Sequence, residues 1–182
     1  MSQGVIPLDE LTEDEAAEIV HVNVLGVVYG SRIALKYFKE TGNSGGGILI
    51  NMTGKGHDGK ASPDTSVYAM TKAAVTSLTR SLAAENKDYP VSVHLLSPGM
   101  VPTDFYRDLR VGRNMEAQAA KLPLILDTIG VPPEETGRLV VQIAAQEPGR
   151  VTGRFYSAFS GARRWRGLAK MMWLGISGKM KG

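Results

Sequence analysis

Two stretches of the chain have the hydrophobic spacing of long helices. Residues 12–41 begin at Thr12 with Glu15 three positions later, which is the spacing of a capping box, and then continue almost entirely apolar. A helix that is apolar nearly all round is expected to be buried on more than one side. Residues 66–86 return to helical spacing, with alanines and leucines supplying a small-residue face.

Short apolar runs between these stretches predict strands. They fall at residues 47–52, 90–96 and 152–159, and the first of them is β-branched and apolar without polar alternation. Residues 103–130 suggest short helices with loops, and a further helix is expected from the prolines at 132–133 to about residue 146. Strands that alternate with helices predict an α/β fold, with a parallel sheet covered by helices on both faces.

The composition indicates a soluble globular chain. Of 182 residues, 43% are hydrophobic and 21% are charged, which is ordinary for one domain with a single core. No apolar run approaches the length of a membrane-spanning helix, and the first residues lack the pattern of a secretory signal. We therefore expect a cytoplasmic protein. With no cysteine and no histidine pair at ligand spacing, we predict no metal site.

The charge is concentrated at the C-terminus. The chain has a net charge of +3, yet residues 161–182 carry six basic side chains and no acidic one, so residues 1–160 sum to −3. The basic pI is thus a property of the tail, and we do not expect a nucleic-acid-binding domain. We divide the chain into a domain at 1–160 and a basic, weakly amphipathic tail at 161–182.

The tail allows two interpretations. Four apolar residues share one helical face: Trp165, Leu168, Ala169 and Met172. This pattern resembles a weak helix at a membrane surface, although Gly167 and Gly175 argue against a long helix. The alternative, which we favour from the sequence, is a solvated basic extension that packs Trp165 onto the body of the protein.

Candidate chemistry centres on Tyr68 and Lys72. Their i, i+4 spacing on a helix places both side chains on one face. A neighbouring ammonium favours the phenolate and lowers the pKa of a tyrosine, so the pair is suited to moving a proton to or from a carbonyl or alcohol oxygen. Taken alone, such a pair also arises by chance on ordinary helices.

The surrounding motifs make the pair specific. In chain order the sequence contains Asn23-Val24-Leu25-Gly26, a strand ending in Asn51, Tyr68-x-x-x-Lys72, Pro98-Gly99-x-x-x-Thr103, Glu134-Glu135 and Val151-Thr152-Gly153. Over about residues 5–160 this series resembles the short-chain dehydrogenase/reductase family. The resemblance implies part of a Rossmann-like doubly wound fold.

The resemblance also implies roles for individual residues. Tyr68 would be the general acid/base, and Lys72 would lower its pKa and hold the nicotinamide ribose hydroxyls. Asn23 would hold a water that links Lys72 to solvent; otherwise it is a satisfied core residue. Four residues after the second strand would line the nicotinamide pocket or, alternatively, form an ordinary turn: Pro98, Gly99, Val101 and Thr103.

One departure from the family concerns a catalytic serine. The family places this serine after the strand, roughly a dozen residues before the tyrosine, but Gly54 takes the position here. Thr53 is the nearest hydroxyl and offers the same donor and acceptor group. Lys55 or His57 are alternatives for polarising a carbonyl, or else simply polar residues of a surface loop.

The second departure is the missing Gly-rich strand–loop–helix, which in this family seats the pyrophosphate. We expect the chain to be the C-terminal part of a longer protein. The first strand should then present an unpaired edge, and the helix at 12–41 should lose part of its cover. Marginal stability or self-association would follow.

The sequence therefore predicts an NAD(P)-dependent oxidoreductase that interconverts a secondary alcohol and a ketone, with NAD or NADP as cofactor. A homo-oligomer formed through the two long helices is expected from the resemblance. Two alternatives stay open: a non-catalytic fragment that acts as a dimerisation or interaction module, and a peripheral membrane reductase for a lipid-like substrate. Neither the substrate nor the choice between NAD and NADP follows from the residues.

Overall fold

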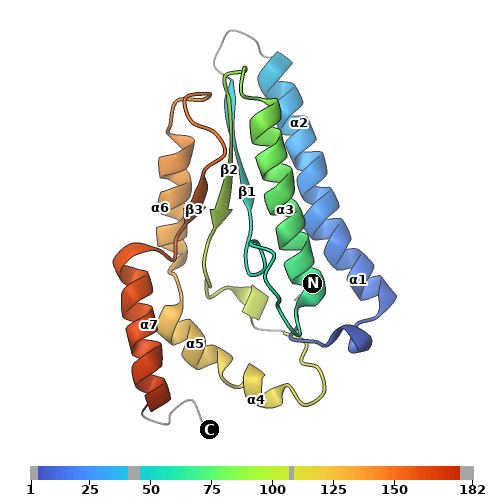
Figure 1. Cartoon of the computed structure of the whole chain (residues 1–182), viewed down its shortest axis with the longest axis vertical. Coiled ribbons are helices and arrows are strands. Elements are labelled where there is room, and N and C mark those ends of the chain that lie inside the picture. Colours follow the sequence, from blue (N-terminus) through green and yellow to red (C-terminus); the bar gives the residue numbers. More distant parts are fainter. Residues whose placement is uncertain (1–3, 41–45, 107–108, 177–182) are drawn as a thin grey trace.

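The fold is built on a three-stranded parallel sheet. The computed structural model describes three stretches of chain: residues 4–40, 46–106 and 109–176. The strands β1 (Gly47–Met52), β2 (Val91–Ser97) and β3 (Phe155–Ser157) lie in the order β1-β2-β3 (Figure 1). Gly47 is in register with Val91, and Leu95 with Phe155. This arrangement confirms the predicted α/β, partly Rossmann-like fold, and β1 forms one edge of the sheet as expected.

One face of the sheet is covered by the two long helical stretches. They comprise α1 (Glu13–Val20) and α2 (Gly26–Glu40), followed after β1 by α3 (Ser66–Glu85). Figure 1 shows α2 and α3 side by side along the strands. The core between these helices and the sheet consists of Leu35, Ala83, Val91 and Val93, with Phe38, Leu49 and Leu82 packed against it. Burial of this apolar surface is what holds the helices to the sheet.

A buried polar bridge fixes the end of β1 against both helices. Asn51 donates from Nδ2 to Oγ1 of Thr79 on α3 at 3.1 Å, and accepts at Oδ1 from Oγ of Ser31 on α2 at 3.4 Å. All three side chains are buried. Because a buried polar group without a partner is costly, this bridge specifies one relative position of α2, β1 and α3.

The remaining helices follow β2 along the chain. The helices α4 (Glu116–Ala119) and α5 (Leu122–Ile129) lie beyond the carboxyl ends of the strands, and α6 (Pro133–Ala144) flanks the sheet on the side away from α3 (Figure 1). These bounds confirm the predicted helices. The strand β3 is shorter than predicted. Thr152 meets β2 through its side chain, whose Oγ1 accepts the Val93 N–H at 2.9 Å, and the Gly153 N–H donates to the Val93 carbonyl at 2.8 Å.

The predicted helix at 12–41 is confirmed, with a change in its middle. The capping box is present: the backbone N–H of Glu15 donates to Thr12 Oγ1 at 3.2 Å, and the Thr12 N–H donates to Glu15 Oε2 at 2.9 Å. Between α1 and α2, however, His21–Leu25 is π-helical. A π-helical turn adds one residue to the ladder and is often found at functional sites.

This helix is not buried on more than one side in the chain alone, which agrees with the expectation that it loses part of its cover. Only Ser31 and Leu35 of α2 are buried, whereas several large side chains are exposed: Val22, Tyr29, Ile33 and Tyr37. By length and composition alone, the helix Glu13–Glu40 could cross a membrane. This finding contradicts the prediction that no apolar run is long enough to do so. A soluble protein's helix passes the same test, and α2 packs through Leu35 and Phe38 onto the sheet.

The segment before α1 is tied to the loop that follows β2. Val5 forms an isolated parallel bridge with Val111. Arg110 pairs with Glu15, and hydrogen bonds from Arg110 and then Thr12 lower the pKa of the Glu15 carboxyl to about 2. Arg113 pairs with Glu10 at 3.2 Å. The N-terminal residues therefore hold the region between β2 and α4 in place.

The segment predicted as a tail is largely helical. The helix α7 (Gly161–Ile176) packs against α5, and Lys170 pairs with Asp127 at 2.9 Å. Trp165 is 74% exposed, so the prediction that it packs onto the body is wrong. The reason is helical geometry: α7 uses its opposite face, with Leu174, for packing. The side chain of Leu168 and residues 177–182 lie outside the described part of the chain.

A buried histidine sits in the middle of β2. His94 is fully buried, and its ring lies edge-on to Tyr156 at a centroid distance of 5.3 Å. Within the described residues, neither ring nitrogen has a hydrogen-bond partner. Burial, followed by the positive charge of Arg154, lowers the pKa of His94.

We predict that His94 makes the fold sensitive to acid. An unfolded histidine binds a proton below about pH 6.5, and the native chain binds it only at lower pH, so the free energy of unfolding falls as the pH drops below about 6.5. Urea titrations at several pH values should show a flatter profile for His94→Leu. The control His21→Gln, at an exposed histidine, should follow the wild type; an unchanged slope in His94→Leu would contradict the prediction.

Candidate active site

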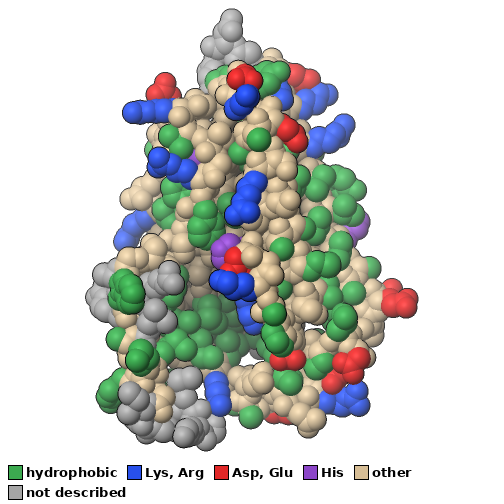
Figure 2. Space-filling model, in the orientation of Figure 1, with side chains coloured by type: hydrophobic (Ala, Val, Ile, Leu, Met, Phe, Trp, Pro, Cys, Tyr) green, Lys and Arg blue, Asp and Glu red, His purple; other side chains and the backbone are tan. Residues whose placement is uncertain are grey.

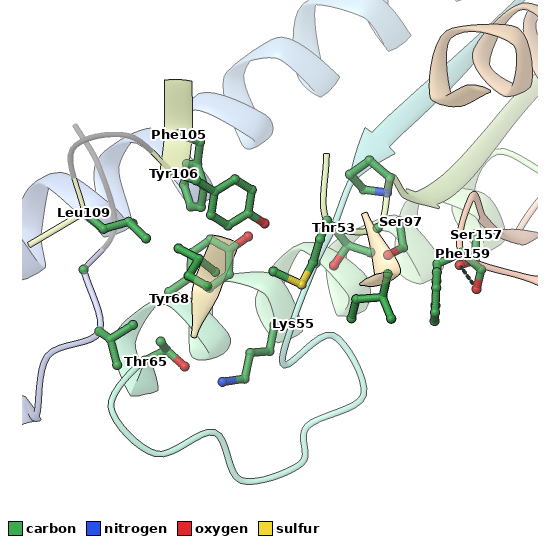
Figure 3. Close-up of a pocket in the computed structure, with 18 residues that line it drawn as sticks. Thr53, Lys55, Thr65, Tyr68, Ser97, Phe105, Tyr106, Leu109, Ser157 and Phe159 are labelled. Atoms are coloured by element: carbon green, nitrogen blue, oxygen red, sulfur yellow. Dashed lines mark hydrogen bonds between the residues drawn. The ribbon is translucent and has the colours of Figure 1, made fainter. Parts of the chain in front are cut away.

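The candidate site lies at the carboxyl ends of the strands, where an α/β sheet usually binds its ligands. The loop after β1, the first turns of α3 and the segment after β2 enclose a cavity of about 450 Å³. Figure 3 shows the side chains that line it, with Tyr68 directed into the space. Residues far apart in the sequence thus meet at one place.

The walls of this cavity are mainly apolar. Figure 2 shows hydrophobic side chains gathered in a recess on this face of the molecule. The apolar wall is formed by Met100, Phe105, Leu109, Leu122, Ile129 and Phe159. Among the described residues that line the cavity, Lys55 is the only one with a charged side chain. The described residues contain no group of three or more metal-ligating side chains. The cavity therefore suits a largely apolar organic ligand.

Tyr68 and Lys72 lie together on α3 as the sequence predicted. They occupy successive turns at the start of the helix, and Lys72 Nζ lies 5.3 Å from the centroid of the Tyr68 ring. Both side chains border a second cavity of about 330 Å³, which is also lined by residues of α1. Tyr68 lines the first cavity as well. The pair thus faces a space in which a cofactor and a substrate can meet.

The pKa of Tyr68 contradicts the predicted direction. Burial of the phenol, and then repulsion from Tyr106, raises the pKa of Tyr68 to about 12. The ammonium of Lys72 lies over the ring instead of beside the hydroxyl, and burial lowers the pKa of Lys72 itself. Desolvation of the phenolate therefore outweighs the attraction of the lysine, and Tyr68 is protonated at neutral pH.

Asn23 joins this pair from the π-helical segment. Its Nδ2 donates to Thr71 Oγ1 at 3.2 Å, and that hydroxyl donates to the backbone carbonyl of Tyr68 at 2.6 Å. Asn23 also borders the second cavity together with Lys72. The structure thus brings Asn23, Tyr68 and Lys72 together, and the π-helical turn is the local feature that places Asn23 there.

Thr53 lies beside the pair, but its hydroxyl is already engaged. Thr53 is buried, its backbone N–H donates to Leu96, and its Oγ1 donates to the carbonyl of Lys72 at 3.2 Å. A threonine hydroxyl has one proton to donate. Thr53 is therefore available to a ligand in the cavity only as an acceptor.

Gly54 leaves open the position where the resemblance places a serine. A Cβ atom at Gly54 would lie 2.7 Å from the hydroxyl oxygen of Tyr68, so the Tyr68 phenol occupies space that a side chain there would need. Next to it, His57 Nδ1 lies 3.1 Å from the Gly54 carbonyl oxygen, and the His57 ring stacks on Phe155. His57 thus holds the loop, whereas Lys55 lines the cavity.

Tyr106 is the functional candidate that the sequence analysis missed. It ends a short 3-10 helix, Asp104–Tyr106, just after β2, and its hydroxyl points toward the hydroxyl of Tyr68 (Figure 3). Burial raises the pKa of Tyr106 as well. The signal in the sequence was weak, because Tyr106 lies in the irregular region 103–130, whose residue types do not reveal chemistry.

The segment after β2 matches the prediction in part. Pro98 and Gly99 line the cavity, and Gly99 has a positive φ of 75° that favours glycine. Thr136 Oγ1 donates to the Pro98 carbonyl at 3.3 Å, which ties this segment to α6. Val101 and Thr103 line neither of the two cavities. The backbone carbonyl of Thr103 instead accepts the N–H of Tyr106.

Comparison with known proteins identifies the family. The family model described as enoyl-(acyl carrier protein) reductase matches residues 3–161. A short chain dehydrogenase/reductase, astE, from Aspergillus oryzae is 31% identical over 157 residues, which is 85% of this chain and 58% of that relative. The chain belongs to the short-chain dehydrogenase/reductase family.

Other relatives match a shorter part of the chain or have a lower sequence identity. A chloroplastic chlorophyll(ide) b reductase, NOL, from Oryza sativa is 39% identical over 101 residues, covering 54% of this chain and 29% of the relative. A 3-ketoacyl-(acyl-carrier-protein) reductase from Brucella melitensis, solved with NADH, has a TM-score of 0.69 at 22% identity, covering 86% of this chain and 61% of the other. The chain thus spans less than two thirds of the length of each of these proteins.

We predict that Tyr68 is the last tyrosine to ionise in the folded chain. Ultraviolet absorbance after a rapid rise in pH should show a tyrosinate transition near 12 that Tyr68→Phe removes. Tyr106→Phe should move this transition to lower pH, because the repulsion between the two phenols is lost. The control Tyr89→Phe, at an exposed ring, should leave it in place. A transition that survives in Tyr68→Phe would contradict the assignment.

Proposed function

We propose that the chain is the catalytic part of an NAD(P)-dependent oxidoreductase that interconverts a secondary alcohol and a ketone. The observation that carries this proposal is the Tyr68–Lys72 pair: Tyr68 lines the mainly apolar cavity at the carboxyl ends of the strands, and both residues line the adjoining second cavity. Relatives named for such an activity, such as the diacetyl reductase of Staphylococcus aureus at 28% identity, support it. The proposal concerns the form of the protein that also contains a nucleotide-binding segment.

The residues around Lys72 fit a nicotinamide nucleotide. Lys72 is half-buried, and its ammonium forms no hydrogen bond with any of the described residues. Lys72 borders the second cavity together with Asn23 and Pro98. The three N–H groups of its ammonium therefore face a space that ribose hydroxyls can enter. Similar folds solved with NADH or NADP support either cofactor. When bound, the nicotinamide supplies the hydride.

Tyr68 performs the proton transfer in this proposal. The high pKa of Tyr68 keeps its hydroxyl protonated at neutral pH, so in the reducing direction it donates a proton to the carbonyl oxygen while the carbonyl carbon gains a hydride. The product is a neutral alcohol, and the negative charge left on the Tyr68 oxygen is stabilised by Lys72. A water between Lys72 and Asn23 would then return the proton from solvent.

Tyr106 supplies the second hydroxyl that Gly54 cannot. Tyr106 is placed to bind the same carbonyl oxygen as Tyr68, because both residues line the cavity and Figure 3 shows their hydroxyls directed into the same part of it. Two donors stabilise the charge that develops on this oxygen better than one. Thr53 is the less suitable partner, since its proton is donated to Lys72.

We predict that Tyr68→Phe lowers kcat for ketone reduction by about a hundred- to ten-thousand-fold. Binding of NADH or NADPH, followed by fluorescence titration, should be retained, because the substitution removes a single oxygen from the proton donor. The assay follows oxidation of the reduced nicotinamide with a simple ketone. Retention of the wild-type kcat in Tyr68→Phe would remove Tyr68 from the mechanism.

We predict that Tyr106→Phe lowers kcat by about ten- to a hundred-fold with little change in KM, because one charge-assisted hydrogen bond to the transition state is lost. The matched control is Thr53→Val, which should leave kcat nearly unchanged while reducing stability by about 1 kcal/mol. The opposite order of effects on kcat would assign the second donor to Thr53. Thermal melting of both variants confirms that the fold is intact.

An interaction module is the second candidate, and the exposed apolar face of α2 favours it. Tyr29, Ile33 and Tyr37 lie on this helix with more than half of their surface exposed, and β1 presents an edge of the sheet. Association through the two long helices would cover such a face in either function. Sedimentation together with nicotinamide binding separates the two: an assembled chain that binds no cofactor in any extended form is a module.

A further inference from the structure

We propose that α7 is an interfacial helix that docks the protein onto an anionic phospholipid surface. The proposal concerns residues 161–176, which lie at or beyond the end of the family match at residue 161. It does not depend on the proposed catalytic function. Two independent features support it: an exposed apolar stripe on α7, and the concentration of positive charge in residues 161–182.

The exposed stripe follows from the way α7 packs. On its inner face, Gly167 and Leu174 are buried, and Leu174 meets the side chains of α5 together with Met171. On the outer face, Trp165 is 74% exposed and Met172, two turns later, is 68% exposed. Figure 1 shows α7 at the outside of the molecule, with α5 on its inner side.

The composition of the stripe suits a lipid interface. Trp173, next to Met172, is 59% exposed, so both tryptophans of the chain lie on the exposed part of one helix. Tryptophan is enriched where a membrane meets water, because its ring is apolar and its N–H still finds a partner. An isolated exposed apolar residue needs no explanation, but three on one face of a basic helix do.

The charge of the segment complements an anionic surface. Residues 161–182 carry six basic side chains and no acidic one, whereas the rest of the chain has a net charge of −3. An anionic bilayer therefore attracts this segment and repels the remainder, which orients the molecule with α7 toward the lipid. A nucleic acid shares the charge, but an apolar stripe with Met172 gains little from phosphates and much from acyl chains.

The expected depth of binding is shallow. The helix has 16 residues, four of them basic, which is too short and too charged to span a bilayer. An amphipathic helix of this kind lies in the plane of the interface, with its apolar face among the acyl chains and its basic groups near the phosphates. Lys170 remains tied to Asp127, so α7 can bind without leaving α5.

The experiment is co-flotation of the intact chain with lipid vesicles. Vesicles of phosphatidylcholine alone are compared with vesicles that contain an equal amount of phosphatidylglycerol. Because both tryptophans lie on α7, their fluorescence should shift to the blue in the same titration. We expect binding to the anionic vesicles only, and we expect it to weaken as salt is raised.

Two variants of α7 and one control on α6 assign the binding to α7. Trp165→Ser should weaken binding about ten-fold, and Arg166→Gln about five-fold. The matched control is Val141→Ser, at a 67% exposed apolar residue of α6, which should bind like the wild type. Since Trp165 and Val141 are both exposed, neither change should disturb folding, and melting temperatures verify this.

Several outcomes would overturn the proposal. They are the absence of flotation, flotation that ignores the anionic lipid, and flotation that Trp165→Ser leaves unchanged while Ile33→Ser on α2 abolishes it. A blue shift produced by an oligonucleotide instead of by vesicles would assign the segment to nucleic acid. A shift that follows protein concentration without lipid would assign it to a second copy of the chain.

Discussion

The position of α3 against the end of β1 is the constraint on which the site depends. Asn51 holds this junction through two buried hydrogen bonds, one to Thr79 of α3 and one to Ser31 of α2. The first turns of α3 then project beyond the sheet and carry Tyr68 into the cavity. A shift of α3 by one turn would leave these buried polar groups unpaired and would destabilise the fold. The position of the Tyr68 phenol is therefore fixed by hydrogen bonds that lie away from the phenol itself.

In the proposed mechanism, the hydroxyl of Tyr106 takes the role that the resemblance assigns to a serine. The glycine after Thr53 lets the Tyr68 phenol occupy the space that a side chain would take, and Figure 3 shows the Tyr106 hydroxyl next to that of Tyr68. A phenol is longer than a serine side chain, so Tyr106 can present a hydroxyl to the cavity from the short 3-10 helix after β2.

Much of this architecture could be predicted from local patterns, because helix and strand periodicity and the Tyr68–Lys72 spacing depend only on neighbouring residues. The π-helical turn at Asn23 could not, since no simple pattern distinguishes it from an α-helical turn. The high pKa of Tyr68 could not either, because it reflects burial among residues distant in sequence. Trp165 was misplaced for a similar reason: helical spacing defines a face, but the packing partner decides which face turns inward.

Gly167 gives α7 a consequence beyond its own surface. A Cβ at this position would lie 3.0 Å from Ile129 and 3.3 Å from Phe159, and both of these residues line the cavity. The helix and the cavity therefore share a wall without intervening atoms. If an occupant of the cavity moves that wall and thereby changes the affinity of α7 for its own partner, the partner must change the affinity of the cavity by the same factor. The close approach at one glycine makes the outer helix and the cavity candidates for reciprocal control.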